Sequence, residues 1–377
     1  MKCIVNGKIL LENQILENKV LVFGKKIVDI TDEVVDGYEI IDANGKYVSP
    51  GLVDIHIHGN VGKDVMDGNE EAISDISKSI VRHGVTSFLP TTMTMGKDSI
   101  DKALQAIRKS MNKNIEGAKP IGVHLEGPFI NEAYKGAQNP EFIIDASYDF
   151  IKDNADIIKV ITYAPEKDTN LEFTKDIKKN TNIVLSIGHS KATYEQAKEA
   201  INLGASNITH LFNGMTGLNH RNPGVVGAAL TSNDAYCEII ADTIHIKKDL
   251  FQFILDNKGK EKVILITDSI EAGGLEDGEY SLGGQKVIVK ENQARLESGS
   301  LAGSVMPLNI MINNFYKNTN LKINEAINLA SLNAARSIHV DNTKGSIQIG
   351  KDADIAIFDE DLNCFMTIVN GEILYKR

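Results

Sequence analysis

Apolar residues recur in strand-length runs along most of this chain, and stretches with helical periodicity separate many of these runs. Eight such runs lie at residues 52–58, 87–91, 121–126, 157–162, 183–187, 207–211, 237–241 and 263–267. Nearly continuous apolar strands that alternate with helices are typical of a parallel sheet buried on both faces. The pattern therefore predicts an α/β fold.

Two of the intervening stretches are the clearest amphipathic helices. They cover residues 71–83 and 194–203, and Gly84 and Gly204 follow them as C-terminal stops. Eight strands over about 290 residues fit a (β/α)8 barrel of the TIM type. A doubly wound open sheet is the structural alternative, but its usual glycine-rich fingerprint is missing after the first strand, which favours the barrel.

The two ends of the chain are instead rich in short β segments and turn-forming pairs. Strand-like runs lie at 3–5, 20–23 and 27–30 near the N-terminus and at 354–358 and 367–369 near the C-terminus. Because neither end can hold a core alone, we expect the two to pair into one small β-sandwich domain. The predicted domains are thus a small β domain from residues 1–48 and 343–377, and a barrel from residues 49–342.

The composition excludes several classes of protein. The 377 residues are 42% hydrophobic and 24% charged, whereas a disordered chain carries fewer apolar residues. A net charge of −11 argues against nucleic acid as the main partner. Three widely spaced cysteines form no disulfide framework, which favours a reducing cytoplasm. Since neither a signal peptide nor a run near the roughly 18 residues of a membrane span is present, we expect no membrane association.

Histidines and carboxylates stand at the ends of the predicted barrel strands. The first strand ends in His56-Ile57-His58, and strand residues two apart point to the same side, so both imidazoles can face one metal. The other strand-end residues are Glu126, His189, His210, His245 and Asp268. Because the C-terminal strand ends of such a barrel meet at its mouth, these side chains are expected to converge. Imidazole and carboxylate ligands suit Zn²⁺ or Fe²⁺.

Taken singly, each of these residues also has a purely structural explanation. Glu126 before Gly-Pro is compatible with a loop carboxylate, Asp268 with a helix N-cap, and His189 with a solvated loop position. His124, two residues before Glu126, is better explained as a buried, hydrogen-bonded histidine than as a ligand. The recurrence of such residues at one strand end after another favours a metal site.

These residues give the chain a resemblance to the amidohydrolase superfamily of metal-dependent hydrolases, and within it to the N-acetylglucosamine-6-phosphate deacetylases. The resemblance spans nearly the whole chain. Its motifs lie at 49–54, 124–129, 135–140, 210–215, 222–224, 301–304 and 350–354. It implies hydrolysis of the acetamide of N-acetylglucosamine 6-phosphate by a cytoplasmic homodimer. It also implies one or two divalent metal ions, Zn²⁺ or Fe²⁺, per subunit.

The resemblance also assigns roles to the strand-end residues. Many amidohydrolases bridge two metals with a modified lysine after the fourth strand, but that segment contains no lysine at 162–166, as in the deacetylases. Glu126 is then the central ligand, together with His189 and His210. The His56 and His58 pair implies a second metal position. Asp268 is assigned as general base toward water and then as general acid toward the leaving amine.

Substrate contacts follow from the same resemblance. Arg221 is assigned to the phosphate, because the planar guanidinium group offers several N–H donors that match phosphate oxygens. His220 is next to it in the sequence and is assigned to the same group. The sugar and acetyl groups are assigned to Ala137, Gln138, Asn213, Gly214, His245, Leu301, Ala302 and Gly303. The chain departs from the family twice, since Gln138 stands where histidine is common and Thr243 where glycine is common.

Three alternatives to this function stay open at this point. The first is the same reaction on N-acetylgalactosamine 6-phosphate, because no residue in the sequence distinguishes the two sugars. The second is another amidohydrolase, such as a dihydroorotase or an adenine deaminase, although the missing lysine argues against it. The third is a barrel that serves as a scaffold without catalysis, although such a protein is expected to lose ligands that this chain keeps.

Overall fold

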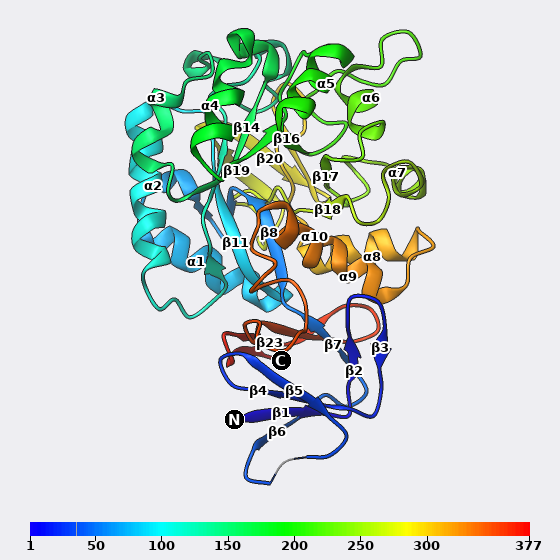
Figure 1. The fold of residues 1–377 in the computed structure, drawn as a ribbon. Helices are drawn as coiled ribbons and strands as arrows, with labels where there is room; N and C mark the ends of the chain where they lie inside the picture. The colour runs from blue at the N-terminus through cyan, green and yellow to red at the C-terminus, as the bar shows by residue number, and fades with distance from the viewer. Residues whose placement is uncertain (35) are drawn as a thin grey trace.

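The structure is a computed structural model that describes residues 1–34 and 36–377. Its larger part is a barrel of parallel strands surrounded by helices, in the upper part of Figure 1. The barrel strands are β8 (Leu52–Ile57), β11 (Val85–Thr92), β13 (Val123–Glu126), β14 (Ile158–Tyr163), β15 (Val184–Ile187), β16 (Ala205–Ile208), β17 (Tyr236–Ile239) and β18 (Val263–Leu265). Each predicted run overlaps one of these strands, and the predicted TIM-type barrel is confirmed.

The barrel closes where its last strand meets its first. Ile57 in β8 forms a parallel bridge with Ser269, just beyond β18. The N–H of His58 donates to the carbonyl of Ser269 at 2.8 Å, and the N–H of Asp268 donates to the carbonyl of His56 at 2.9 Å. Closure therefore places two candidate histidines next to Asp268.

A short strand, β12 (Lys119–Pro120), pairs with β11.

Helices on the outside of the barrel contribute apolar side chains to its core. They are α1 (Glu70–Ile80), α2 (Lys97–Met111), α3 (Tyr148–Ile151), α4 (Glu172–Asn180), α5 (Tyr194–Leu203), α6 (Gly224–Leu230), α7 (Phe251–Lys258), α8 (Leu308–Lys317), α9 (Ile323–Leu329) and α10 (Leu332–Ser337). The predicted helix at 194–203 coincides with α5. Its first turn is capped by Thr193, whose side chain accepts a backbone N–H, and it ends at Gly204 with φ +120°.

The helix predicted at 71–83 is α1 followed by one turn of 3-10 helix, Val81–His83. Gly84 ends it with φ +85°, a conformation that residues with a side chain rarely adopt. A Cβ at Gly84 would lie 2.4 Å from the ring of Phe358. Glycine at this position therefore allows the end of the helix to pack directly on the small β domain.

The small β domain consists of two sheets built from both ends of the chain. Its strands are β1 (Lys2–Val5), β2 (Lys8–Leu10), β3 (Ile15–Leu16), β4 (Val20–Phe23), β5 (Ile27–Thr31), β6 (Glu39–Asp42), β7 (Tyr47–Pro50), β22 (Ile355–Phe358), β23 (Cys364–Val369) and β24 (Glu372–Lys376). One sheet has the order β5-β4-β1-β6 and the other β24-β23-β22-β7-β2-β3. Ile4, Phe23, Ile355 and Ile368 belong to their shared core. The predicted pairing of the chain ends is confirmed, and both termini lie in this domain (Figure 1).

The predicted boundary between residues 48 and 49 falls inside β7, which pairs with β2 and β22 in the six-stranded sheet. We therefore propose that the barrel begins after β7, near residue 51, and that its C-terminal boundary stays at residues 342 and 343.

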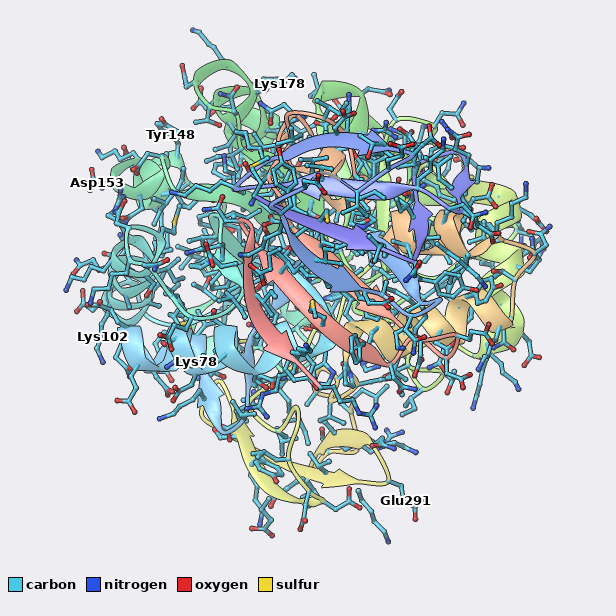
Figure 2. All side chains as sticks on the ribbon, turned by 90° about the horizontal axis from the view of Figure 1, so that it is seen from below. Lys78, Lys102, Tyr148, Asp153, Lys178 and Glu291 are labelled. Carbon is cyan, nitrogen blue, oxygen red and sulfur yellow. The ribbon has the colours of Figure 1, made fainter. Side chains whose placement is uncertain are left out.

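A three-stranded antiparallel sheet interrupts the barrel after β18, where the sequence analysis predicted no strands. It consists of β19 (Gly278–Leu282), β20 (Gln285–Lys290) and β21 (Gln293–Leu296). It projects from one side of the barrel, with Glu291 near its tip (Figure 2). The turn pair Gly283-Gly284 before the β-branched run Val287-Ile288-Val289 is a hairpin signal that could have revealed it.

Among the described residues, no helix combines the length and the apolar character needed to cross a lipid bilayer.

Candidate metal centre

The strand ends at the mouth of the barrel carry the candidate residues. Glu126 is the last residue of β13, and His189, His210 and Asp268 follow the ends of β15, β16 and β18 within three residues. The last three adopt positive φ angles of +47°, +31° and +48°. Such left-handed conformations cost about 1–2 kcal/mol per residue outside glycine and cluster at functional sites. The backbone is therefore strained at the points where it directs these side chains inward.

Three groups of possible ligand atoms lie close together, and Glu126 belongs to two of them, while the third consists of His56, His124 and Glu238. Glu126, His189 and His210 form the first. The Glu126 Oε1 atom lies 3.2 Å from the Nε2 atom of His189 and 3.2 Å from that of His210. The two Nε2 atoms are 3.2 Å apart. All three side chains are buried, so water screens this group little.

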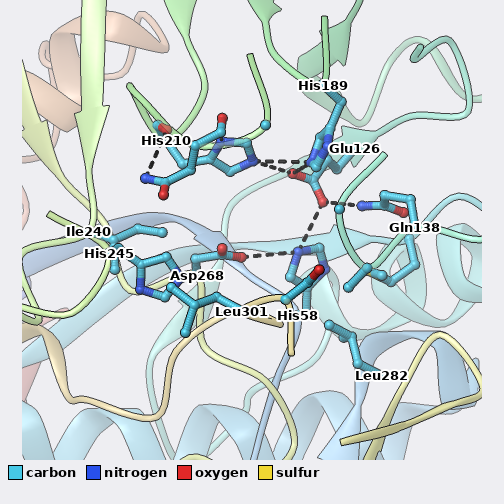
Figure 3. Close-up of a pocket in the computed structure, with 17 residues that line it drawn as sticks. His58, Glu126, Gln138, His189, His210, Ile240, His245, Asp268, Leu282 and Leu301 are labelled. Carbon is cyan, nitrogen blue, oxygen red and sulfur yellow. Dashed lines mark hydrogen bonds and ion pairs between the residues drawn. The ribbon is translucent and has the colours of Figure 1, made fainter. Parts of the chain in front are cut away.

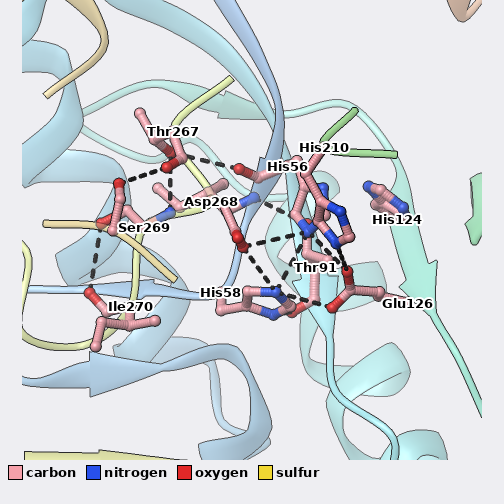
Figure 4. Close-up of polar contacts among 12 residues, drawn as sticks. His56, His58, Thr91, His124, Glu126, His210, Thr267, Asp268, Ser269 and Ile270 are labelled. Atoms are coloured by element: carbon pink, nitrogen blue, oxygen red, sulfur yellow. Dashed lines mark hydrogen bonds and ion pairs between the residues drawn. The ribbon is translucent and has the colours of Figure 1, made fainter. Parts of the chain in front are cut away.

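His56, His58, Glu126 and Asp268 form the second group (Figure 4). The Nε2 atoms of His56 and His58 are 3.3 Å apart. Glu126 places Oε1 3.3 Å from His56 and Oε2 3.1 Å from His58. Asp268 Oδ1 lies 3.4 Å and 3.3 Å from the same two nitrogens. One carboxylate, that of Glu126, thus joins the two groups.

The hydrogen bonds made by Nδ1, the ring nitrogen farther from the cluster, determine which nitrogen of a histidine carries a lone pair toward the centre. The Nδ1 atoms of His189, His210 and His58 lie 2.8, 3.0 and 3.2 Å from the backbone carbonyls of Tyr134, Asn213 and Thr91. A carbonyl only accepts, so each of these Nδ1 atoms carries the proton and donates it. In the neutral rings, Nε2 then holds a lone pair directed at the other ligand atoms.

Lone pairs that face one another at these distances require a cation between them. In a tetrahedral zinc site with ligand bonds of about 2.0–2.2 Å, neighbouring ligand atoms are about 3.3–3.6 Å apart. The separations of 3.1 to 3.4 Å in both groups are close to that edge length. The residues of both groups therefore fit a divalent metal ion.

The electrostatics of the cluster favours positive charge. Burial disfavours the charged form of His58, but its hydrogen bonds to Asp268 and Glu126 outweigh burial and raise its pKa to about 9. Burial likewise opposes ionisation of Asp268, yet His56 and His58 lower its pKa to about 2. The neighbouring histidines also hold the pKa of Glu126 well below its usual range despite burial. Both carboxylates are thus anionic and attract either protons or a metal ion.

A cavity of about 300 Å³ opens above these groups and has room for a sugar-sized ligand (Figure 3). His58, Glu126, His189, His210 and Asp268 line its floor. Of the residues assigned to the substrate, Ala137, Gln138, Asn213, Gly214, His245, Leu301 and Gly303 line it as well. The structure therefore brings most of the predicted site residues together in one cavity.

Four predicted residues lie outside this lining. His56 is fully buried below the cavity, and Ala302 is fully buried between two lining residues. His220 and Arg221 are exposed on the loop that precedes α6. Within the described residues, the Arg221 guanidinium forms no hydrogen bond or ion pair, so its donors face solvent.

The sequence model of the amidohydrolase family matches residues 47–374. The chain belongs to the amidohydrolase family.

Individual relatives agree with this assignment. An N-acetylglucosamine-6-phosphate deacetylase of Lysinibacillus sphaericus is 37% identical, with 92% of this chain and 91% of the relative covered. An N-acetylgalactosamine-6-phosphate deacetylase of Escherichia coli O157:H7 is 35% identical, with 89% of both covered. The crystal structure of N-acetylglucosamine-6-phosphate deacetylase from Pasteurella multocida superposes with a TM-score of 0.94 at 30% identity, over 99% of each chain. The amidohydrolase fold is thus shared along the full length.

Gln138 holds the central carboxylate of this amidohydrolase. Its Oε1 accepts the N–H of Thr94 at 2.7 Å, which directs its Nε2 toward Glu126 Oε2 at 2.6 Å. The side chain is 2% exposed, so both hydrogen bonds are shielded from water. The amide thereby orients Glu126 between the two groups of ligands.

Thr243 keeps a backbone conformation that explains why glycine is common at this position. Its φ of +68° is unfavourable for a β-branched residue. The carboxylate of Asp242 stabilises the turn, since its Oδ1 accepts the N–H groups of Ile244 and His245 at 2.8 Å each. Its Oδ2 lies 2.7 Å from His245 Nδ1 and fixes that ring at the cavity.

The sequence analysis missed several residues that support the site. Glu238 in β17 contacts His56, and Asp242 contacts His245. Leu282 of β19 lines the cavity, together with Met93 and Ile240. Two signals in the sequence could have found some of them: a carboxylate inside an otherwise apolar strand run, as at Glu238, and a carboxylate directly after a strand run, as at Asp242.

Proposed function

We propose that this amidohydrolase hydrolyses the acetamide of N-acetyl-D-glucosamine 6-phosphate to D-glucosamine 6-phosphate and acetate. The observation that carries the proposal is the convergence of four imidazole Nε2 atoms on the Glu126 carboxylate below a sugar-sized cavity that Asp268 also lines. The relative from Lysinibacillus sphaericus, 37% identical, is named for this activity, as is the structural neighbour from Pasteurella multocida.

Glu126, His189 and His210 would hold one divalent ion, Zn²⁺ or Fe²⁺, and His56 and His58 would hold a second one with the same carboxylate. Such an ion lowers the pKa of water to near 7 and polarises a carbonyl group. An amide is a poor electrophile with a poor leaving group, so the reaction needs both effects together with a proton shuttle.

Asp268 is proposed as that shuttle. Its carboxylate lines the cavity, and its Oδ1 atom lies 3.4 Å from His56 Nε2 and 3.3 Å from His58 Nε2. It therefore can accept a proton from the attacking water and then donate it to the amine nitrogen as the C–N bond breaks. Its left-handed backbone directs the side chain to the cavity, where it is 8% exposed as a residue.

The substrate residues divide between the two ends of the cavity. His245, fixed by Asp242, is proposed to bind a sugar hydroxyl. Ala137, Gln138, Asn213 and Gly214 would contact the sugar, and Leu301 and Gly303 would enclose the acetyl group, with Ala302 buried between them. Arg221 and His220, on the exposed loop, are proposed to bind the phosphate.

Replacing Arg221 with alanine is expected to raise KM for N-acetylglucosamine 6-phosphate about 10-fold, because a charge-assisted hydrogen bond contributes about 1.5 kcal/mol. The control substrate is N-acetylglucosamine without phosphate, for which the variant and the wild type should give equal kcat/KM. An equal loss on both sugars would contradict a phosphate contact.

The function is tested by measuring acetate released from N-acetylglucosamine 6-phosphate. Turnover should stop on chelation and return when Zn²⁺ or Fe²⁺ is added, because both ligand groups require a cation. The same assay with N-acetylgalactosamine 6-phosphate, the substrate in the name of the Escherichia coli relative, decides between the two sugars by kcat/KM. A metal-loaded protein that releases acetate from neither sugar refutes the proposal and favours the scaffold.

The homodimer and the cytoplasmic location stay predictions. Sedimentation of the purified protein tests the first, and fractionation of the source cells tests the second.

A further inference from the structure

A further buried carboxylate, that of Glu238, lies behind the metal centre and has no part in the mechanism above. It belongs to β17, and its side chain is completely buried. Its Oε2 atom lies 3.1 Å from His56 Nδ1 and 3.4 Å from the backbone N–H of His210. Its Oε1 atom has no hydrogen-bond partner among the described residues.

The position of Glu238 is costly for the fold. A buried carboxylate with an unpaired oxygen destabilises a protein unless another interaction offsets its desolvation. Glu238 Oε2 lies closer to His56 Nδ1, at 3.1 Å, than to the backbone nitrogen of His210, at 3.4 Å, so the contact with His56 is the stronger of the two. Relief of this cost thus depends on a proton at His56 Nδ1.

His56 differs from the other three histidines in its outer partner. His58, His189 and His210 donate from Nδ1 to neutral backbone carbonyls. His56 alone among the four has a carboxylate there. A carboxylate partner fixes the tautomer with Nε2 unprotonated, orients the ring, and makes that nitrogen a stronger metal ligand.

We propose that Glu238 is a positioning residue for the second metal ion: it holds His56 with its Nε2 lone pair directed at the centre and thereby creates the binding site formed with His58. The inference rests on the metal centre of the proposed function. Glu238 thereby helps to determine whether the chain binds one ion or two. Without its carboxylate, the His56 ring can rotate or carry its proton on Nε2, and the second ion then loses a ligand.

The test measures Zn²⁺ binding directly by competition with a chromogenic chelator and counts bound ions by atomic emission. In Glu238→Ala, we expect affinity for one of two ions to fall about 10–100-fold, the usual effect of removing such an outer partner. Glu238→Gln should lose less, because its amide oxygen still accepts from Nδ1. The ion lost should be the one that His56→Ala also loses.

The double variant separates positioning from a general structural effect. If Glu238 acts through His56, then Glu238→Ala combined with His56→Ala binds Zn²⁺ as His56→Ala alone does. The matched control is Asp168→Asn, another buried carboxylate, which accepts from Phe173 and Thr174 at the start of α4 and should leave Zn²⁺ binding unchanged. Circular dichroism verifies folding, and Glu238→Gln serves if the alanine variant does not fold.

Each outcome has a definite consequence. Two ions bound by Glu238→Ala with wild-type affinity, or additive losses in the double variant, overturn the role of Glu238 and leave the proposed function intact. The role of Glu238 is also overturned if the wild type binds a single ion and both His56→Ala and Glu238→Ala bind that ion with wild-type affinity. A wild type that binds no Zn²⁺ and releases no acetate instead refutes the proposed function itself.

Discussion

Replacing Asp268 with asparagine is expected to lower kcat for acetate release by about 10²–10⁴-fold, the usual contribution of a general acid–base group. Asparagine matches the shape of the side chain but cannot accept a proton from water or return it to the amine. KM should change little, because the carboxylate acts on the reacting atoms rather than on the sugar. Steady-state kinetics of the metal-loaded variant measures both quantities.

The control for this variant is its metal content, since Asp268 Oδ1 lies 3.3 to 3.4 Å from the nitrogens of His56 and His58. A loss of rate with both ions retained assigns the effect to proton transfer. Asp168→Asn again provides the matched carboxylate variant away from the cavity, and its kcat should stay at the wild-type value. A variant at position 268 with near-normal kcat and full metal content would rule out the proposed base.

Replacing Glu126 with glutamine is expected to reduce bound metal to near zero. It should also lower kcat/KM by about 10³-fold or more, since the lost metal supplies several kcal/mol of transition-state stabilisation. This carboxylate lies within 3.3 Å of the Nε2 atoms of all four histidines. Glutamine keeps one oxygen but removes the negative charge that both ligand groups share.

Metal analysis after extensive dialysis, followed by the acetate assay, measures this second prediction. Glu132→Gln is the matched control, because Glu132 is an exposed carboxylate in the loop after β13 and should leave both metal and rate unchanged. Full metal content in Glu126→Gln would contradict the central place of this carboxylate in both groups.

The candidate ligands could be predicted from the sequence because each one is a local feature. His56 and His58 share a strand face by their spacing alone, and Glu126, His189 and His210 each follow a recognisable apolar run. The general rule that strand ends meet at the mouth of a barrel then predicted their convergence. The structure places all five within two ligand groups joined by Glu126.

The residues that orient those ligands could not be predicted in the same way. Gln138 reaches Glu126 and Glu238 reaches His56 across 12 and 182 positions of sequence. Neither pairing leaves a periodicity or a spacing, because Gln138 reaches the site from the loop after β13, and Glu238 reaches His56 from a strand that is not adjacent to β8. The same holds for Leu282, which reaches the cavity only because the sheet of β19 to β21 extends from the rim.

The sequence alone was enough to predict the eight barrel strands, the glycine stops of two helices and the family resemblance. All of these depend on residues that are near one another along the chain, where backbone geometry and apolar periodicity are decisive. For His56, His58 and His189, only the tertiary structure shows which ring nitrogen faces the centre, because the other nitrogen meets a carbonyl or carboxylate 33 to 182 residues away along the chain. It also decided that β8 meets the end of β18, since closing the ring brings Asp268 to His56 and His58.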